Sequence, residues 1–196
     1  MVLFFDTETT GLKPGKIAQL SYIIYSDGSV CGKNFYFAVD YVEPSAQAVH
    51  GLSKEKLFAL SGGKVFSDHA DEIYDDFAAA NVLVAHNAPF DISFMRAEFS
   101  YIDRLFSYQG VFDTMRYFTD IIKLPRLHST HFKFPKLSEL KDYAEVYDYD
   151  VTRFVMKNFG DGAAFYHDAR FDTAAMYLSC VALKSKAPEM SELLFK

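Results

Sequence analysis

The first apolar run of the chain ends in two acids, and this feature most constrains the fold. Residues 2–5 are Val-Leu-Phe-Phe, and Asp6 and Glu8 follow before a turn at Gly11. Because alternate side chains of a strand point to the same face, Asp6 and Glu8 are expected to project together at the strand's carboxyl end. Two close carboxylates raise each other's pKa, and a cation relieves that cost. From this segment alone, a metal site and an ordinary solvent-facing strand end are both open.

The composition is that of a globular protein whose surface does not attract nucleic acid in general. Half of the 196 residues are hydrophobic, so we expect a single domain spanning residues 1–196. The formal charge is −6, from 26 acids and 20 bases, which excludes a protein that binds nucleic acid through overall positive charge. Any contact with nucleic acid must therefore be local.

The chain carries no signal for export or for a membrane. Its two cysteines, Cys31 and Cys180, lie far apart without metal or redox spacing, so we expect buried thiols in a reducing compartment. The start leads directly into a strand, which predicts no signal peptide. No apolar run approaches the roughly 18 residues of a membrane span. We therefore expect a cytoplasmic protein without membrane contact.

Hydrophobic periodicity predicts an antiparallel meander followed by alternating strands and helices. Besides the first strand, the expected strands are Ile17–Tyr25 and Lys33–Val39, joined across Asp27-Gly28, then Val82–Ala85 and Gly110–Asp113. The expected helices are 54–60 after a Ser53 cap, 68–80 after a Ser67 cap, one opened by Pro89, one ending at Lys123, and about 137–147, 151–158, 169–184 and a short one after Pro188. This order predicts an α/β fold with a mixed sheet flanked by helices.

Two later segments place further polar residues at the ends of elements. His86 and Asn87 follow the strand 82–85, and Asp91 falls in the first turn of the next helix, where the helix dipole alone is sufficient reason for an acid. His167 and Asp172 stand five apart, which on one helix would separate them by about 140°. They can converge if Asp168 caps the helix and His167 lies in the preceding Gly-rich loop.

Taken together, these segments resemble the DnaQ-like 3′–5′ exonucleases of the DEDDh class, whose fold is RNase H-like with a mixed five-stranded sheet. The resemblance covers nearly the whole chain, and its motifs occur in the same order as in the family. It is carried by FFDTETTGL at residues 4–12 and HDARFD at 167–172, with support from VHGL at 49–52, AHNAPFD at 85–91, FDT at 112–114 and KLSEL at 136–140.

The resemblance implies a two-metal hydrolysis that releases nucleoside 5′-monophosphates from single-stranded 3′ ends of DNA or RNA. Two Mg²⁺ or Mn²⁺ ions would suit oxygen ligands. The implied metal ligands are Asp6, Glu8, Asp91 and Asp172, with Asp6 bridging and His167 as the general base. The implied substrate contacts are Thr9, Leu12 and Asn87, although a Leu after a turn is as readily a core residue.

Several functions fit the same residues. Polymerase proofreading with a DNA polymerase partner, RNA trimming and oligoribonuclease activity all use this set, and fold analogy does not choose among them. A non-catalytic binding subunit and an RNase H-like endonuclease or strand transferase are the alternatives from other classes. Retention of all five catalytic residues argues against a non-catalytic subunit. The His-to-Asp spacing and the Asp-x-Glu strand argue against an endonuclease or a strand transferase.

The segment from Leu124 to Tyr166 departs from the compact family pattern. It interleaves basic and aromatic residues: Arg126, His128, His131, Phe132, Lys133, Phe134 and Lys136. Such a mixture can bind a phosphate backbone and stack a base, as in single-strand binders. An ordinary surface loop is the alternative interpretation.

Overall fold

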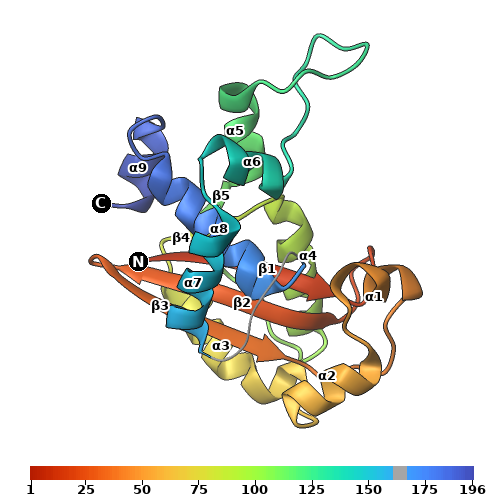
Figure 1. Ribbon diagram of the computed structural model, residues 1–196. Helices are drawn as coiled ribbons and strands as arrows, with labels where there is room; N and C mark the ends of the chain where they lie inside the picture. Colours follow the sequence, from red (N-terminus) through yellow and green to blue (C-terminus); the bar gives the residue numbers. More distant parts are fainter. Residues whose placement is uncertain (161–166) are drawn as a thin grey trace.

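A mixed five-stranded sheet forms the centre of the protein (Figure 1), in a computed structural model that describes residues 1–160 and 167–196. The strands are β1 (Val2–Thr9), β2 (Ile17–Ser26), β3 (Ser29–Tyr36), β4 (Val82–Ala85) and β5 (Val111–Asp113). Their order is β3-β2-β1-β4-β5, with antiparallel pairing from β1 to β3 and parallel pairing from β1 to β5. The predicted RNase H-like sheet is confirmed.

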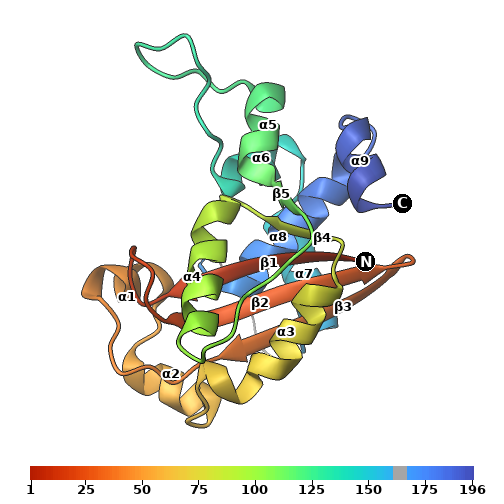
Figure 2. The same ribbon diagram turned by 180° about the vertical axis from the view of Figure 1, so that it is seen from behind.

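Helices cover both faces of this sheet. The helices are α1 (Pro44–His50), α2 (Lys54–Ser61), the 3-10 helix η1 (Phe66–His69), α3 (Ala70–Ala79), α4 (Ala88–Ser100), α5 (Thr114–Ile122), α6 (Leu137–Tyr143), α7 (Asp148–Phe159), α8 (Ala169–Ala182) and α9 (Pro188–Leu194). Figure 1 shows α7 and α8 in front of the sheet, and Figure 2 shows α3 and α4 on the opposite face. Among the described residues, no helix is both long enough and apolar enough for a bilayer span.

The alternation along β1 divides the core in two. Val2 and Phe4 join the core beneath α8, whereas Leu3 and Phe5 join the core beneath α3 and α4. Phe4 and Phe5 are both fully buried. Since Asp6 and Glu8 continue the series of Val2 and Phe4, both acids belong to the face that α8 covers.

The hairpin between β2 and β3 is tighter than predicted. Asp27 and Gly28 both have positive φ, 51° and 78°, as a two-residue turn of mirror-image type requires. Pairing therefore starts at once, with Ser26 opposite Ser29, and β3 covers Ser29–Tyr36 in place of the predicted Lys33–Val39. Cys31 is consequently exposed near the hairpin end of an edge strand, so the expectation of a buried thiol was wrong there, whereas Cys180 in α8 is buried.

Helix boundaries differ from prediction where local capping decides them. Ser53 caps α2 as predicted, by accepting a hydrogen bond from the Lys56 amide. Ser67 is not a cap, because Asp68 accepts from the Val65 amide and η1 forms before α3 begins at Ala70.

Other boundaries shift by a few residues. The sixth helix ends at Tyr143 and not at 147, because the chain turns at Glu145 with a φ of 57°. The seventh begins at Asp148 and not at 151, with acids in its first turn, where the helix dipole favours them. The eighth ends at Ala182 in place of 184.

Candidate active site

Three carboxylates meet where β1 ends beneath α8. One carboxylate oxygen of each of Asp6, Glu8 and Asp172 lies within 4.8 Å of the others. Glu8 is buried, and Asp6 and Asp172 are partly buried. The strand alternation brings the first two together, and the first turn of α8 adds the third. The arrangement is a dense group of acidic oxygens, which is a suitable donor set for a hard cation.

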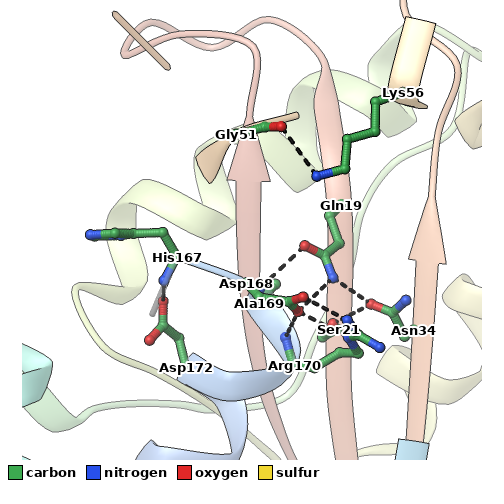
Figure 3. Close-up of polar contacts among 10 residues, drawn as sticks. All are labelled: Gln19, Ser21, Asn34, Gly51, Lys56, His167, Asp168, Ala169, Arg170 and Asp172. Carbon is green, nitrogen blue, oxygen red and sulfur yellow. Dashed lines mark hydrogen bonds and ion pairs between the residues drawn. The ribbon is translucent and has the colours of Figure 1, made fainter. Parts of the chain in front are cut away.

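The start of α8 has the geometry that the sequence predicted. Asp168 is the N-cap, and its side chain accepts a hydrogen bond from the Arg170 amide. His167 therefore lies outside the helix, with a φ of 64°, and its backbone N–H donates to Asp172 Oδ2 at 3.2 Å. Figure 3 shows its ring pointing away from the helix start. Residues 161–166, which precede His167 in the sequence, lie outside the described residues.

A buried glutamine joins the sheet to this helix start (Figure 3). Gln19 of β2 is 1 % exposed and stands opposite Glu8 in the register of β1 and β2. Its Nε2 donates to Asp168 Oδ1 at 3.0 Å and to Asn34 Oδ1 at 2.8 Å, and its Oε1 accepts from the Ala169 amide at 3.3 Å. Sequence reasoning missed Gln19, although it shares the strand face of Asp6 and Glu8.

Asp91 approaches from the opposite face of the sheet, in the first turn of α4 as predicted. It is 3 % exposed, and its Oδ1 accepts from Thr7 twice, from the backbone amide at 3.1 Å and from the hydroxyl at 2.7 Å. Asn87 caps α4 in the left-handed conformation, with a φ of 73°, and its amide donates to Asp113. Asp91 is not part of the close group of three carboxylates.

Burial raises the proton affinity of all four acids, and the charges of neighbouring acids add to it. Burial raises the pKa of Asp6 well above its usual range, and the charges of Asp91 and Asp172 raise it further. Burial, followed by the charges of Asp172 and Asp168, raises the pKa of Glu8 to about 9. Burial also raises the pKa values of Asp91 and Asp172 to about 7. Holding all four ionised near neutral pH therefore requires a counter-charge.

A hollow of about 560 Å³ opens onto this group. Its lining residues are Asp6, His86, Lys136, Leu137, Ser138, His167 and Asp172. Both ring nitrogens of His86 are engaged, Nδ1 with the Thr114 hydroxyl at 3.0 Å and Nε2 with the Pro135 carbonyl at 2.9 Å. Acids, one lysine and two histidines therefore line the hollow, and one of these histidines, His86, already uses both ring nitrogens.

Two of the three expected substrate contacts, Thr9 and Leu12, lie in different surroundings, and the third, Asn87, is the N-cap of α4. Thr9 is buried, and its hydroxyl donates to the Gly11 carbonyl at 2.8 Å. Leu12 is 83 % exposed, so it is not a core residue. His50 Nε2 lies 3.2 Å from the Thr9 carbonyl and braces the turn that follows β1.

Comparison with known proteins gives a family match over most of the chain. The model of the exonuclease family RNase_T matches residues 3–176. The DNA polymerase III subunit epsilon of Rickettsia felis is 34 % identical over 111 residues, which cover 52 % of this chain and 45 % of that protein. The corresponding subunit of Escherichia coli (strain K12) is 37 % identical over 112 residues, covering 52 % and 44 %. The chain thus matches less than half the length of these relatives.

A solved aminopeptidase structure resembles this chain weakly. Proline aminopeptidase P II from Yersinia pestis aligns with 80 % of this chain and 41 % of its own, at 13 % identity and a TM-score of 0.29. A score this low carries no argument about fold or function.

Proposed function

The chain belongs to the DnaQ-like exonuclease family, and from that premise we propose that it hydrolyses the terminal phosphodiester bond of single-stranded 3′ ends, releasing nucleoside 5′-monophosphates. The observation that carries the proposal is the meeting of Asp6, Glu8 and Asp172 within 4.8 Å at the carboxyl end of β1. DNA is the proposed substrate, because the relatives are subunits of DNA polymerase III.

The donor set fits Mg²⁺ or Mn²⁺. The three close side chains offer only carboxylate oxygens, and their raised pKa values indicate that a bare, ionised cluster is costly. Asp6, Glu8 and Asp172 would hold one ion, and Asp6 with Asp91 a second. When bound, such ions lower the pKa of water and offset the negative charge that develops on the phosphate.

The residues of the chain supply the remaining steps. His167 would take the proton of the attacking water, because it lines the same hollow as Asp6 and Asp172. Thr9, Leu12 and Asn87 are proposed to contact the terminal nucleotide. Asp168 and Gln19 would hold the start of α8, and with it His167 and Asp172, in place.

The direct test uses a 5′-labelled single-stranded 20-mer of DNA and a matched RNA, each with Mg²⁺ and with Mn²⁺. We expect both strands to be shortened one nucleotide at a time from the 3′ end, with mononucleotides as product. Hydrolysis of the DNA should be faster than hydrolysis of the RNA. Internal fragments would instead indicate an endonuclease, and faster RNA hydrolysis would reassign the substrate. No product with either metal would reject the proposed activity.

We further propose that this activity serves a DNA polymerase, as the names of the relatives suggest. In proofreading, the exonuclease should prefer an unpaired terminus. We expect a primer with a mismatched 3′ nucleotide to be shortened faster than a fully paired one, and equal rates would argue against this use.

Replacing Gln19 by Leu is expected to lower kcat by roughly 10- to 100-fold with little change in KM, because a misplaced catalytic group can cost about 10²-fold. The substitution removes both hydrogen bonds from the Gln19 side chain to the start of α8. Steady-state kinetics on the 20-mer, together with the melting temperature, measure the effect.

Asn34→Ala is the matched control, because it removes another partner of Gln19 but leaves the contacts to α8. We expect Asn34→Ala to lower the melting temperature without lowering kcat to the same extent. A positioning role is ruled out if the two variants lose kcat equally, or if Gln19→Leu keeps the wild-type value.

A further inference from the structure

Helix α5 and the segment that joins it to α6 carry an excess of basic residues. Between residues 114 and 136 the chain carries five Lys or Arg and a single acid, Asp120, although the whole protein has a formal charge of −6. Figures 1 and 2 show that this segment, the α5–α6 loop (residues 123–136), extends away from the body of the protein. A local positive region on an acidic protein is where a polyanion would bind.

The α5–α6 loop and helix α5 together line a hollow of about 450 Å³ that combines cations with exposed rings. Its lining residues are Arg116, Thr119, Asp120, Arg126, Thr130, His131, Phe132 and Phe134. Phe134 is 54 % exposed and Phe132 is 39 % exposed, so both rings offer faces for stacking. Arg116 is paired with Asp113 at 3.5 Å, whereas no hydrogen bond or ion pair joins the Arg126 guanidinium to the described residues, and only its backbone carbonyl accepts, from the Ser129 amide.

The loop is fixed at its base and open at its tip. The Lys133 amide donates to the Leu124 carbonyl at 2.9 Å, and the Lys133 ammonium pairs with Glu139 at 2.5 Å. Leu127, near the tip, is 88 % exposed. Because the base of the loop is fixed in this way, the loop holds its aromatic rings and charged side chains in a defined position.

The loop leads directly into the candidate active site. The Pro135 carbonyl contacts His86 Nε2 at 2.9 Å, and Lys136 lines the same hollow as Asp6 and His167. Phe134 is two residues from Lys136, which is at most about 7 Å along an extended chain. The basic and aromatic surface is therefore continuous with the place where a 3′ end would be cut.

We propose that the α5–α6 loop binds the single strand upstream of the 3′ terminus, with Phe132 and Phe134 stacking on bases and Arg126 contacting a phosphate. This inference rests on the proposed exonuclease function. Single-stranded nucleic acid is the occupant that fits, because it is a polyanion with exposed base faces and it must already reach the adjoining carboxylates. The loop thereby favours long substrates over a minimal one.

The experiment compares the wild type with Arg126→Ala, Phe134→Ala and the double variant on two substrates. One is a single-stranded DNA 20-mer, and the other is the nitrophenyl ester of a nucleoside 5′-monophosphate, which is too small to reach the loop. For the 20-mer, KM should rise at least about fivefold in Phe134→Ala, as expected for one lost stacking contact. Turnover of the ester should stay within twofold, and exposed Arg153→Ala in α7 is the matched control on both substrates.

Salt dependence tests the assignment of Arg126 to a phosphate. Affinity is measured by fluorescence anisotropy of a labelled 20-mer in EDTA, so that no turnover is needed. Losing one phosphate contact should reduce the slope of log K against log salt by about 0.7. Arg153→Ala should leave that slope unchanged.

The outcomes separate the two proposals. If the wild type hydrolyses neither substrate, the exonuclease function fails, and the anisotropy measurement alone decides about the loop. If the loop variants match the wild type in KM for the 20-mer and in anisotropy, the loop does not bind the strand. Equal losses on the ester and the 20-mer would also overturn the inference, because they would indicate damage to the catalytic site.

Discussion

Replacing Asp6 by Asn should reduce hydrolysis by about three orders of magnitude or more while the protein remains folded. Asp6 shares the carboxylate cluster with Glu8 and Asp172 and is the proposed bridging ligand. A divalent ion contributes several kcal/mol of transition-state stabilisation, and about 4 kcal/mol corresponds to a factor of about 10³ in rate. Initial rates on the single-stranded 20-mer, measured over a series of Mg²⁺ and Mn²⁺ concentrations, test this expectation.

The same variant should not lose stability when no metal is present. The pKa values of Asp6, Glu8 and Asp172 are raised in the folded state, so these groups favour folding below their unfolded pKa values near 4. That contribution is lost as pH rises through about 7 for Asp172 and about 9 for Glu8. Asp6→Asn removes one charge from the cluster, so at pH 8 in EDTA its melting temperature should equal or exceed that of the wild type.

Metal addition distinguishes a ligand from a merely structural acid. At 100 times its dissociation constant, a metal adds about 2.7 kcal/mol to the stability of the wild type. For a chain of this length, that gain corresponds to a rise in melting temperature of roughly 5–10 °C. Asp6→Asn should show little of this rise, whereas exposed Asp150→Asn in α7 should behave as the wild type. If Asp6→Asn keeps more than a tenth of the activity, or the full thermal shift, Asp6 is not the bridging ligand.

The parts of the site that follow from local rules could be predicted from the sequence. Strand alternation placed Asp6 and Glu8 on one face, and the N-cap at Asp168 separated His167 from α8. The first-turn position of Asp91 in α4 followed from the strand-to-helix turn at Asn87. Each of these arrangements depends on residues within a few positions of one another.

What escaped prediction depends on pairing between distant segments. Gln19 looks like a polar interruption of an apolar strand, and its role becomes visible only when the register sets it opposite Glu8 and α8 lies across it. Helix α1 has no buried residue, so hydrophobic periodicity could not reveal it, although Pro44 and Gly51 were available as start and stop signals. Cys31 was misjudged because its strand is at the sheet edge, a property of the topology.

The two histidines that line the hollow differ in what their rings can do. His86 uses both nitrogens in contacts with Thr114 and Pro135, and burial lowers its pKa. His167 is exposed, and among the described residues its ring makes no hydrogen bond. An imidazole without competing partners can accept a proton from water, whereas one already engaged on both sides cannot do so without breaking a structural contact.

His167→Ala should therefore lower kcat by about 10²–10⁴-fold, the usual contribution of a general base, with an unchanged melting temperature because the side chain is exposed. His86→Ala should lower the free energy of unfolding by about 1–3 kcal/mol, because Thr114 and Pro135 are left without a partner. Its kcat should change little, because the proton acceptor His167 is kept. Added imidazole should restore part of the activity of His167→Ala on the nitrophenyl ester substrate, and should not restore that of Asp6→Asn. A purely structural His167 predicts no rescue, and a loss of less than about tenfold, or an equal loss in His86→Ala, would assign proton transfer to another group.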